Sequence, residues 1–160
     1  MLVIDPALVC NGTYGHHRSI SQGSLLVPCS DMSGTIVDLG KNVSEWSKGQ
    51  RVASIFNQTH LQGQVKEKDM TSGLGLPLSG VLTQFRVFPA YGLVAVPEYL
   101  SDEEMACLPI AAVTAWTSMN WMQPIGQPLA DPQITVLFQG TGGVSINGLQ
   151  IAKACGLKGK

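Results

Sequence analysis

The glycine-rich segment that follows Phe138 carries the residues best suited to bind a charged cofactor. Gly140, Gly142 and Ser145 stand in the order Gly-x-Gly-x-x-Ser directly after the apolar run Ile134–Phe138. Glycines at the first two positions allow a tight turn and let the phosphates of a dinucleotide approach main-chain N–H groups. Ser145, at the third position, is small enough to let a helix pack on the strand, and its hydroxyl can donate to phosphate. The segment therefore predicts a pyrophosphate-binding turn.

The sequence on either side of the turn fits this prediction. Ile134–Phe138 is a continuous apolar run, typical of a strand that is buried on both faces of a parallel sheet. After the turn, small and apolar residues recur at helical spacing as far as Cys155, and Gly156 provides a C-terminal stop. The N-terminus of such a helix attracts anions. From the turn alone, a glycine-rich β–α turn without a ligand is an equal alternative, because such motifs also occur by chance.

The residue that would contact the adenosine ribose is expected about 20 residues beyond the turn, at the end of the next strand. The sequence ends at Lys160, before that position is reached. One strand and one helix cannot form a doubly wound sheet, because the strand would have no neighbour to pair with. We therefore expect either a fragment or a shortened product that pairs its strand edge elsewhere.

Two helices are predicted before the turn. Ser101-Asp-Glu-Glu104 is a capping box, in which the serine hydroxyl and Glu104 satisfy main-chain N–H groups reciprocally. A short helix to about Leu108 follows from it. Pro109 suits the first turn of a second helix over Ile110–Met122, and this helix is apolar nearly all round. An all-apolar helix is expected to be buried.

The first hundred residues are predicted to be rich in β-structure. Strands are expected within Gly34–Gly40, Arg51–Phe56 and Val81–Phe88, which are short runs bounded by turn residues. Residues 57–80 are polar and rich in Gly and Ser, and they predict a long surface loop of the kind that usually serves a site. Turn residues recur about every ten positions, which favours a small barrel or sandwich.

Composition excludes several classes of protein. Of the 160 residues, 44% are hydrophobic and only 13% are charged, which rules out a disordered chain. The net charge is −1 and no basic run occurs, so no nucleic-acid partner is expected. No apolar stretch approaches the roughly 20 residues that span a bilayer, so no membrane partner is expected either. The start lacks the features of a signal peptide and the four cysteines form no CxxC pair, which favours reduced thiols in the cytoplasm.

Short motifs spread over nearly the whole chain carry a family resemblance. They are, in order, Val27–Gly34, Gly40–Val52, Gly80–Phe85, Val96-Pro97, Leu100-Ser101, Leu108–Trp116 and Gly140–Ser145. As an ordered set they resemble the medium-chain dehydrogenase/reductase superfamily, that is, the zinc-type alcohol dehydrogenases and their zinc-free quinone reductase relatives. In the second motif Gln50 stands where the family usually has Asp.

The resemblance implies a fold of mixed β and α/β class. Residues 1–100 would form a GroES-like β-barrel, the N-terminal domain of alcohol dehydrogenases. Residues 101–160 would form linking helices and the first β–α unit of an incomplete, truncated Rossmann domain. Residues that match the family's cofactor site are Thr114, beside the nicotinamide, and the pyrophosphate turn of Gly140, Thr141, Gly142, Gly143, Val144 and Ser145.

The family's catalytic zinc is not expected here. Its histidine position falls at Ser30, a neighbouring glutamate position at Asp31 and a later cysteine position at Ile110, while the first cysteine would lie near Val3. None of these side chains is a good zinc ligand except Asp31, and catalytic zinc needs three protein ligands. The four-cysteine lobe for structural zinc is also absent between residues 57 and 80.

The resemblance therefore implies a zinc-independent, NAD(P)-dependent oxidoreductase, or a part of one, acting on a small carbonyl, enone or alcohol. NADPH is favoured because zinc-free relatives often use it, and a homodimer is a candidate assembly. The resemblance identifies no catalytic residue. A truncated, non-catalytic product that acts only through protein association is the alternative. A GroES-like chaperone module is a third hypothesis, and it gives the glycine turn no purpose.

A few other side chains have chemistry of their own. One local cluster has metal-ligand types but matches no familiar zinc spacing, so a polar surface loop is the better interpretation: Cys10, His16, His17 and Cys29. His60 is a candidate proton shuttle or a solvated loop histidine. Tyr91 is a candidate proton donor or part of an ordinary aromatic turn.

Overall fold

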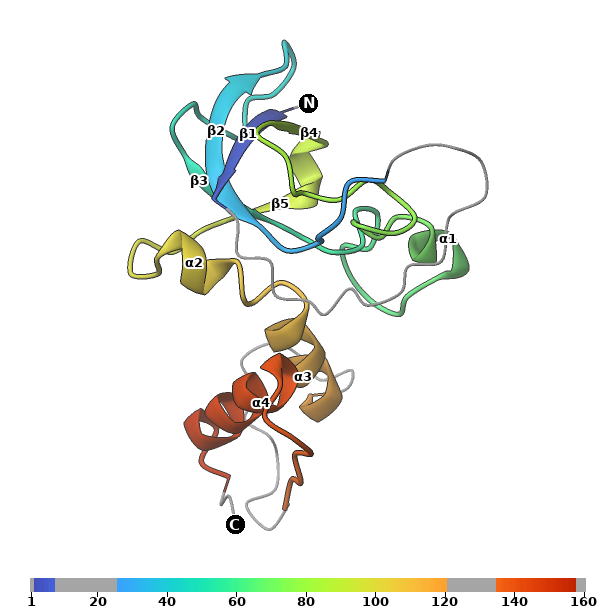
Figure 1. Cartoon of the computed structure of the whole chain (residues 1–160), viewed down its shortest axis with the longest axis vertical. Coiled ribbons are helices and arrows are strands. Elements are labelled where there is room, and N and C mark those ends of the chain that lie inside the picture. The colour runs from blue at the N-terminus through green and yellow to red at the C-terminus, as the bar shows by residue number, and fades with distance from the viewer. Residues whose placement is uncertain (1, 8–25, 121–134, 158–160) are drawn as a thin grey trace. The chain divides into compact units, whose positions relative to one another are not determined.

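The computed structural model describes residues 2–7, 26–120 and 135–157 (Figure 1). The chain divides into two compact units, Met1–Pro109 and Ile110–Lys160. The first is built on a β-sheet and the second on two helices. Within the described residues, no helix has the length and apolar character needed to cross a bilayer.

The sheet of the first unit has five strands in the order β4-β1-β2-β3-β5, and every neighbouring pair is antiparallel. Its strands are β1 (Leu2–Ala7), β2 (Ser33–Leu39), β3 (Arg51–Ser54), β4 (Arg86–Phe88) and β5 (Leu93–Ala95). The register pairs Gly34 with both Pro6 and Val52, so β2 lies between β1 and β3. A bulge interrupts the β1–β2 pairing between Val3 and Ile4.

The structure confirms the predicted strands at β2 and β3 and corrects the third. Only Arg86–Phe88 of the predicted run Val81–Phe88 is a strand, because the main chain of Val81 bonds instead to the carbonyls of Pro28 and Cys29. The sequence did not predict β1 or β5. The first contains a proline and the second has only three residues, so neither carries a strong strand pattern.

One apolar cluster forms the core of this unit. Its enclosed side chains come from all five strands and from the segments between them: Ile4, Cys29, Met32, Ile36, Val52, Leu74, Val81, Phe88 and Leu93. Leu74 belongs to the predicted surface loop 57–80. That loop therefore does not lie wholly on the surface, and it includes the short helix α1 (Glu67–Met70) with the buried Asp69.

The predicted capping box at Ser101 is confirmed. The Ser101 hydroxyl accepts a hydrogen bond from the main-chain N–H of Glu104, and the Glu104 carboxylate accepts one from the N–H of Ser101. The helix that it begins, α2 (Asp102–Met105), is shorter than the predicted extent to about Leu108. It follows the short 3-10 helix η1 (Ala90–Gly92) and β5 along the chain.

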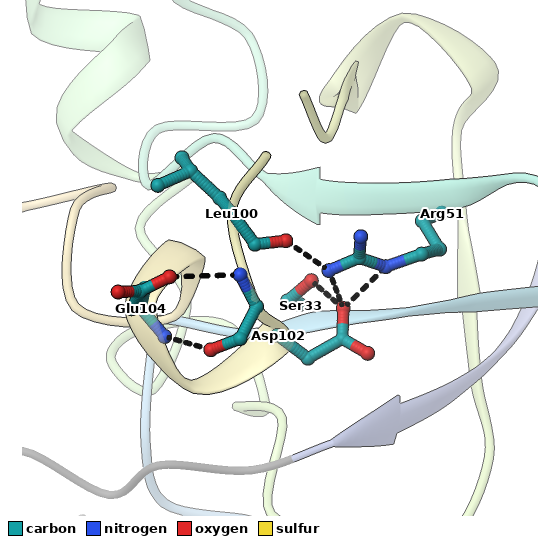
Figure 2. A network of polar contacts seen from close by, with 6 residues as sticks. Ser33, Arg51, Leu100, Asp102 and Glu104 are labelled. Carbon is teal, nitrogen blue, oxygen red and sulfur yellow. Dashed lines mark hydrogen bonds and ion pairs between the residues drawn. The ribbon is translucent and has the colours of Figure 1, made fainter. Parts of the chain in front are cut away.

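An ion pair holds α2 against the sheet (Figure 2). Asp102 Oδ1 accepts hydrogen bonds from Nε and Nη2 of Arg51 on β3, at 3.0 and 2.9 Å, and from the Ser33 hydroxyl of β2 at 2.6 Å. Arg51 Nη2 also donates to the Leu100 carbonyl at 2.8 Å. These bonds join two strands to the start of α2.

The second unit packs α3 (Ala111–Met119) against α4 (Gly143–Ala154). Both helices were predicted, although the end of the first prediction, at Trp121 and Met122, lies outside the described residues. The expectation that the first helix is buried is wrong for the described part: Ala115 is its one buried residue, and Val113 is 58% exposed. A helix with one neighbouring helix buries a single stripe, whatever the residues on its other faces.

The predicted strand Ile134–Phe138 is not a strand where it is described. Ile134 itself lies outside the described residues, and residues 135–139 have no strand pairing. A β-strand needs a hydrogen-bonded neighbour, and no described segment of this unit offers one. Phe138 still packs with Ala152 and Leu157 in the small apolar cluster of the unit.

Candidate functional site

The glycine turn leads directly into α4, as the sequence predicts. Gly140 has a φ of +80°, a left-handed conformation that glycine adopts without strain. Gly142 is the N-cap of α4, with φ −77° and ψ 173°, and the helix begins at Gly143. The turn residues are exposed, apart from the partly buried Ser145.

The N-terminus of α4 is open to a ligand. The first hydrogen bond inside the helix runs from Ile146 N–H to the Gly142 carbonyl, so the N–H groups of Gly143, Val144 and Ser145 have no partner within the helix. No side chain caps the helix, and its first turn has no acidic residue. Among the described residues, a Cβ placed on Gly140 or Gly142 would meet no atom within 4 Å. The start of α4 therefore combines main-chain N–H donors that have no partner in the helix with space that no described atom fills.

The third motif residue, Ser145, makes a hydrogen bond within the turn. Its hydroxyl donates to the Gln139 carbonyl at 2.9 Å and so closes the turn. The close helix packing that was assigned to Ser145 occurs one turn later, at Gly148, where a Cβ would lie 2.1 Å from Cε1 of Phe138. The sequence contained a signal for this, because Gly148 belongs to the apolar and small residues at helical spacing.

Thr114 lies in the same unit as the turn, exposed on α3. The contact between the two helices is close near their starts: a Cβ on Gly143 would lie 3.2 Å from the Ala111 Cβ. Ala111 is one helical turn before Thr114. The second unit thus contains every residue of the predicted cofactor site, from Thr114 to the turn Gly140–Ser145.

The residues at the family's zinc positions form a different arrangement. Ser30 is buried, and its hydroxyl donates to Oδ1 of Asp31 at 2.7 Å. Ile110 is the N-cap residue of α3. In residues 26–120 and 135–157, no three His, Cys, Asp or Glu side chains gather closely enough to hold a metal ion. Of the side chains at the zinc positions, only the Asp31 carboxylate is an ordinary zinc ligand, whereas catalytic zinc takes three protein ligands.

The structure describes only some of the remaining candidates. Cys10, His16 and His17 of the predicted local cluster lie outside the described residues, while Cys29 is buried in the core of the first unit. Tyr91 is exposed on η1. His60 is paired rather than simply solvated, because its Nδ1 lies 3.6 Å from Oδ2 of the buried Asp69.

Asp69 organises the loop around His60. The main-chain N–H of Lys66 and the Thr59 hydroxyl bond to its carboxylate at 3.0 and 2.8 Å. These two hydrogen bonds lower the pKa of Asp69 from its ordinary value. The sequence gives no signal for this network, because the spacing between Thr59 and Asp69 predicts a contact only once the conformation of the loop is known.

Comparison with known proteins agrees with this fold. Residues 6–98 match the model of the alcohol dehydrogenase GroES-like domain. A zinc-type alcohol dehydrogenase-like protein from Schizosaccharomyces pombe is 39% identical over 131 residues, which are 82% of this chain and 37% of that protein. An L-threonine 3-dehydrogenase from Ruegeria pomeroyi is 28% identical over 80% of this chain and 37% of its own length.

Solved structures give the same result. A crystal structure described as an alcohol dehydrogenase from Sinorhizobium meliloti has a TM-score of 0.82 and 31% identity, over 99% of this chain and 47% of that one. An NAD-dependent alcohol dehydrogenase has a TM-score of 0.73 and 25% identity, over 99% and 48%. The chain therefore spans less than half the length of these relatives.

Proposed function

The chain belongs to the alcohol dehydrogenase GroES-like domain family, and we propose that it contributes the phosphate-binding turn of a nicotinamide-dependent oxidoreductase. The proposed ligand is NADPH or NADH, and the proposed substrate of the whole enzyme is a small carbonyl, enone or alcohol. Relatives named as dehydrogenases and reductases support this reaction class.

The observation that carries the proposal is the open N-terminus of α4. Three main-chain N–H groups, at Gly143, Val144 and Ser145, have no partner in the helix, and the space over Gly142 is empty of described atoms. The helix dipole adds about half a positive charge at this end. A pyrophosphate bridge offers the oxygen acceptors and the negative charge that such an end attracts.

The cofactor and the chain have different roles in the proposed reaction. When bound, the nicotinamide ring supplies hydride chemistry. The chain would hold the pyrophosphate at Gly140, Thr141, Gly142, Gly143, Val144 and Ser145. Thr114 is the proposed contact beside the nicotinamide, and it would orient the ring.

We propose that the reaction proceeds without zinc. The support is the bond between Ser30 and Asp31, which occupies the side chains at two of the family's metal-site positions. NADPH is the preferred form on the sequence resemblance alone. A cytoplasmic location and a homodimer likewise stay predictions of the sequence, to be tested by cell fractionation and sedimentation.

A binding titration tests the proposal. The chain is titrated with NADPH and with NADH, and nucleotide fluorescence is followed. We expect dissociation constants in the micromolar range, and Gly142→Asp should weaken binding by about tenfold or more, because its carboxylate occupies the phosphate position. Gln150→Glu is the matched control, since it adds the same charge to an exposed position two turns along α4.

Two results would contradict the proposal. The first is the absence of binding at millimolar nucleotide, which would favour the non-catalytic alternative. The second is equal weakening by Gly142→Asp and Gln150→Glu, which would show a general charge effect rather than a site at the turn. A fold check by circular dichroism accompanies each variant.

A further inference from the structure

A pocket of about 340 Å³ lies within the first unit. The loop 57–80 provides one group of lining residues, among them Thr59, Lys68 and Thr71. The segment formed by β4 and η1 provides the other, among them Arg86 and Tyr91. The volume is at the small end of the range for ligand sites. None of its lining residues belongs to the proposed nucleotide turn.

Hydrogen bonds hold the loop side of the pocket in place. Gln58 is 5% exposed; its main-chain N–H donates to the Ser72 carbonyl at 3.0 Å, and its side-chain amide donates to the Ile55 carbonyl at 2.6 Å. Ser72 is 4% exposed, and its hydroxyl donates to the Asp69 carbonyl at 2.7 Å. The wall is therefore formed before any ligand arrives, which reduces the entropic cost of binding.

Arg86 gives the pocket a cation without a carboxylate. Its Nη1 donates to the Gly80 carbonyl, and its guanidinium lies 5.1 Å from the Phe88 ring centre. Nε is buried and has no partner among the described residues. Among the described side chains, ion pairs join Arg51 to Asp102 and Lys48 to Asp38, His60 lies beside Asp69, and none of these contacts involves Arg86.

This arrangement has an electrostatic cost. Burial lowers the pKa of Arg86, because removal from water disfavours the charged form. A partly buried cation is stabilised when an anion joins it, and a carboxylate suits the planar guanidinium best. The carboxylate of Asp69, in the loop that forms one wall of the pocket, is already bonded to Thr59 and Lys66.

The other lining residues define the rest of a ligand. Lys68, exposed on α1, is a second cation, and hydroxyl groups are present at Thr59, Thr71 and Tyr91. Apolar surface lies next to them, because Val87 is 44% exposed and Leu78 is 39% exposed, and both residues line the pocket. The pocket therefore matches an anionic head group joined to a small apolar body.

We propose that this pocket binds a small organic carboxylate, with Arg86 and Lys68 at its carboxylate group and its apolar body against Leu78 and Val87. The site shares no residue with the proposed nucleotide turn, because all of its residues belong to the first unit. Its occupation can therefore be measured with no nucleotide present.

The test is an NMR titration of the isotope-labelled chain with benzoate and with benzyl alcohol, a neutral molecule of similar size. We expect saturable benzoate binding that shifts the amide signals of Gln58, Ser72 and Val87. The affinity for benzyl alcohol should be lower by a factor of about ten or more, since this molecule lacks the charge. Arg86→Gln should weaken benzoate binding by a similar factor, and Lys68→Gln by about threefold.

Two further variants keep the test decisive. Arg86→Lys retains the charge and should bind benzoate more tightly than Arg86→Gln. Lys48→Gln is the control: it removes a surface cation that is paired with Asp38 and does not line the pocket, and it should leave the affinity for benzoate unchanged. If Arg86→Gln does not fold, Arg86→Lys and the exposed Lys68→Gln decide the matter. Equal binding of benzoate and benzyl alcohol would overturn the proposal. The proposal would also be overturned if neither Arg86→Lys nor Lys68→Gln altered the affinity for benzoate. Amide shifts that occur only outside Gln58, Ser72 and Val87 would overturn it as well.

Discussion

The two units of the chain offer ligands different kinds of chemistry. The described part of the first unit encloses nine residues in its core and presents charged side chains, such as those of Arg86 and Lys68, at its pocket. The described part of the second has two buried residues in its apolar cluster, Ala152 and Leu157, and presents main-chain N–H groups at the start of α4. Side-chain substitutions should therefore affect the first unit most, and glycine substitutions the second.

The exposed apolar residues mark the same contrast. In the second unit Leu137 is 91% exposed and Leu149 is 53% exposed, while in the first unit Ile36 and Phe88 are at most 1% exposed. Burial of apolar side chains is the main source of folding free energy. We therefore expect the first unit to have the larger free energy of unfolding.

The largest expected effect is on the core of the first unit. Phe88→Ala removes a ring that is 1% exposed and should lower the free energy of unfolding by about 3–5 kcal/mol, because a cavity remains. Val87→Ala, at the neighbouring position that is 44% exposed, is the control and should cost little. Urea unfolding followed by circular dichroism measures both. Equal losses would contradict the proposed core.

A smaller loss is expected at the ion pair that holds α2. Asp102→Asn removes the charge that Arg51 faces and should cost about 2–3 kcal/mol, since a partly buried guanidinium loses its partner. Asp38→Asn is the control, because its ion pair with Lys48 is well exposed and should contribute little. Urea midpoints of the two variants give the comparison, and a larger loss at Asp38 would overturn it.

The same ion pair predicts a dependence on pH. Burial alone raises the pKa of Asp102, but hydrogen bonds from Ser33 and Arg51 and the charge of Arg51 together hold it below its ordinary value. The carboxylate therefore adds stability above the ordinary Asp pKa of about 4, and this is lost as the pH falls through the lowered value.

Urea unfolding between pH 2.5 and pH 7 measures this contribution, with those limits chosen to lie about the ordinary pKa of Asp. The difference in stability between the natural chain and Asp102→Asn should be constant near neutral pH and shrink in acid. A difference that grows in acid would contradict the assigned role of Asp102.

The capping box and the glycine turn show what local sequence can predict. Ser101 and Glu104 interact within one helical turn, so their spacing determines the contact. Gly140 likewise lies in a turn that leads into a helix, as its place in the motif predicts, and it has a φ of +80°. These features depend on residues that are close in sequence, where a pattern contains nearly all the information.

Contacts between distant residues could not be predicted in this way. Asp102 binds Ser33, 69 positions away, and the pocket brings Thr59 near β4. No periodicity encodes such pairs, since they depend on the sheet order β4-β1-β2-β3-β5. The predicted strand that is absent over residues 135–138 has the same origin: an apolar run indicates burial, but a strand also needs a partner to pair with.

In the glycine turn, a moderate loss is expected at Gly140. Gly140→Ala forces a side chain into a φ of +80° and should cost about 1–2 kcal/mol in the second unit. Space is not the cause, because a Cβ there would meet no described atom within 4 Å. Urea unfolding monitored by NMR signals from α4 measures the loss. An unchanged midpoint would show that the turn has another conformation.

The smallest change in stability, and the sharpest separation of stability from binding, is expected at Gly142. Its φ of −77° and ψ of 173° suit any residue, and serine is a better N-cap than the natural glycine. Gly142→Ser should therefore stabilise α4 by about 0.3 kcal/mol, because the hydroxyl of the new serine accepts a hydrogen bond from an N–H of the first turn. That same N–H is one that the pyrophosphate would need. The variant should thus unfold at slightly higher urea but bind NADPH more weakly, whereas an unaltered affinity would show that the nucleotide does not use this helix end.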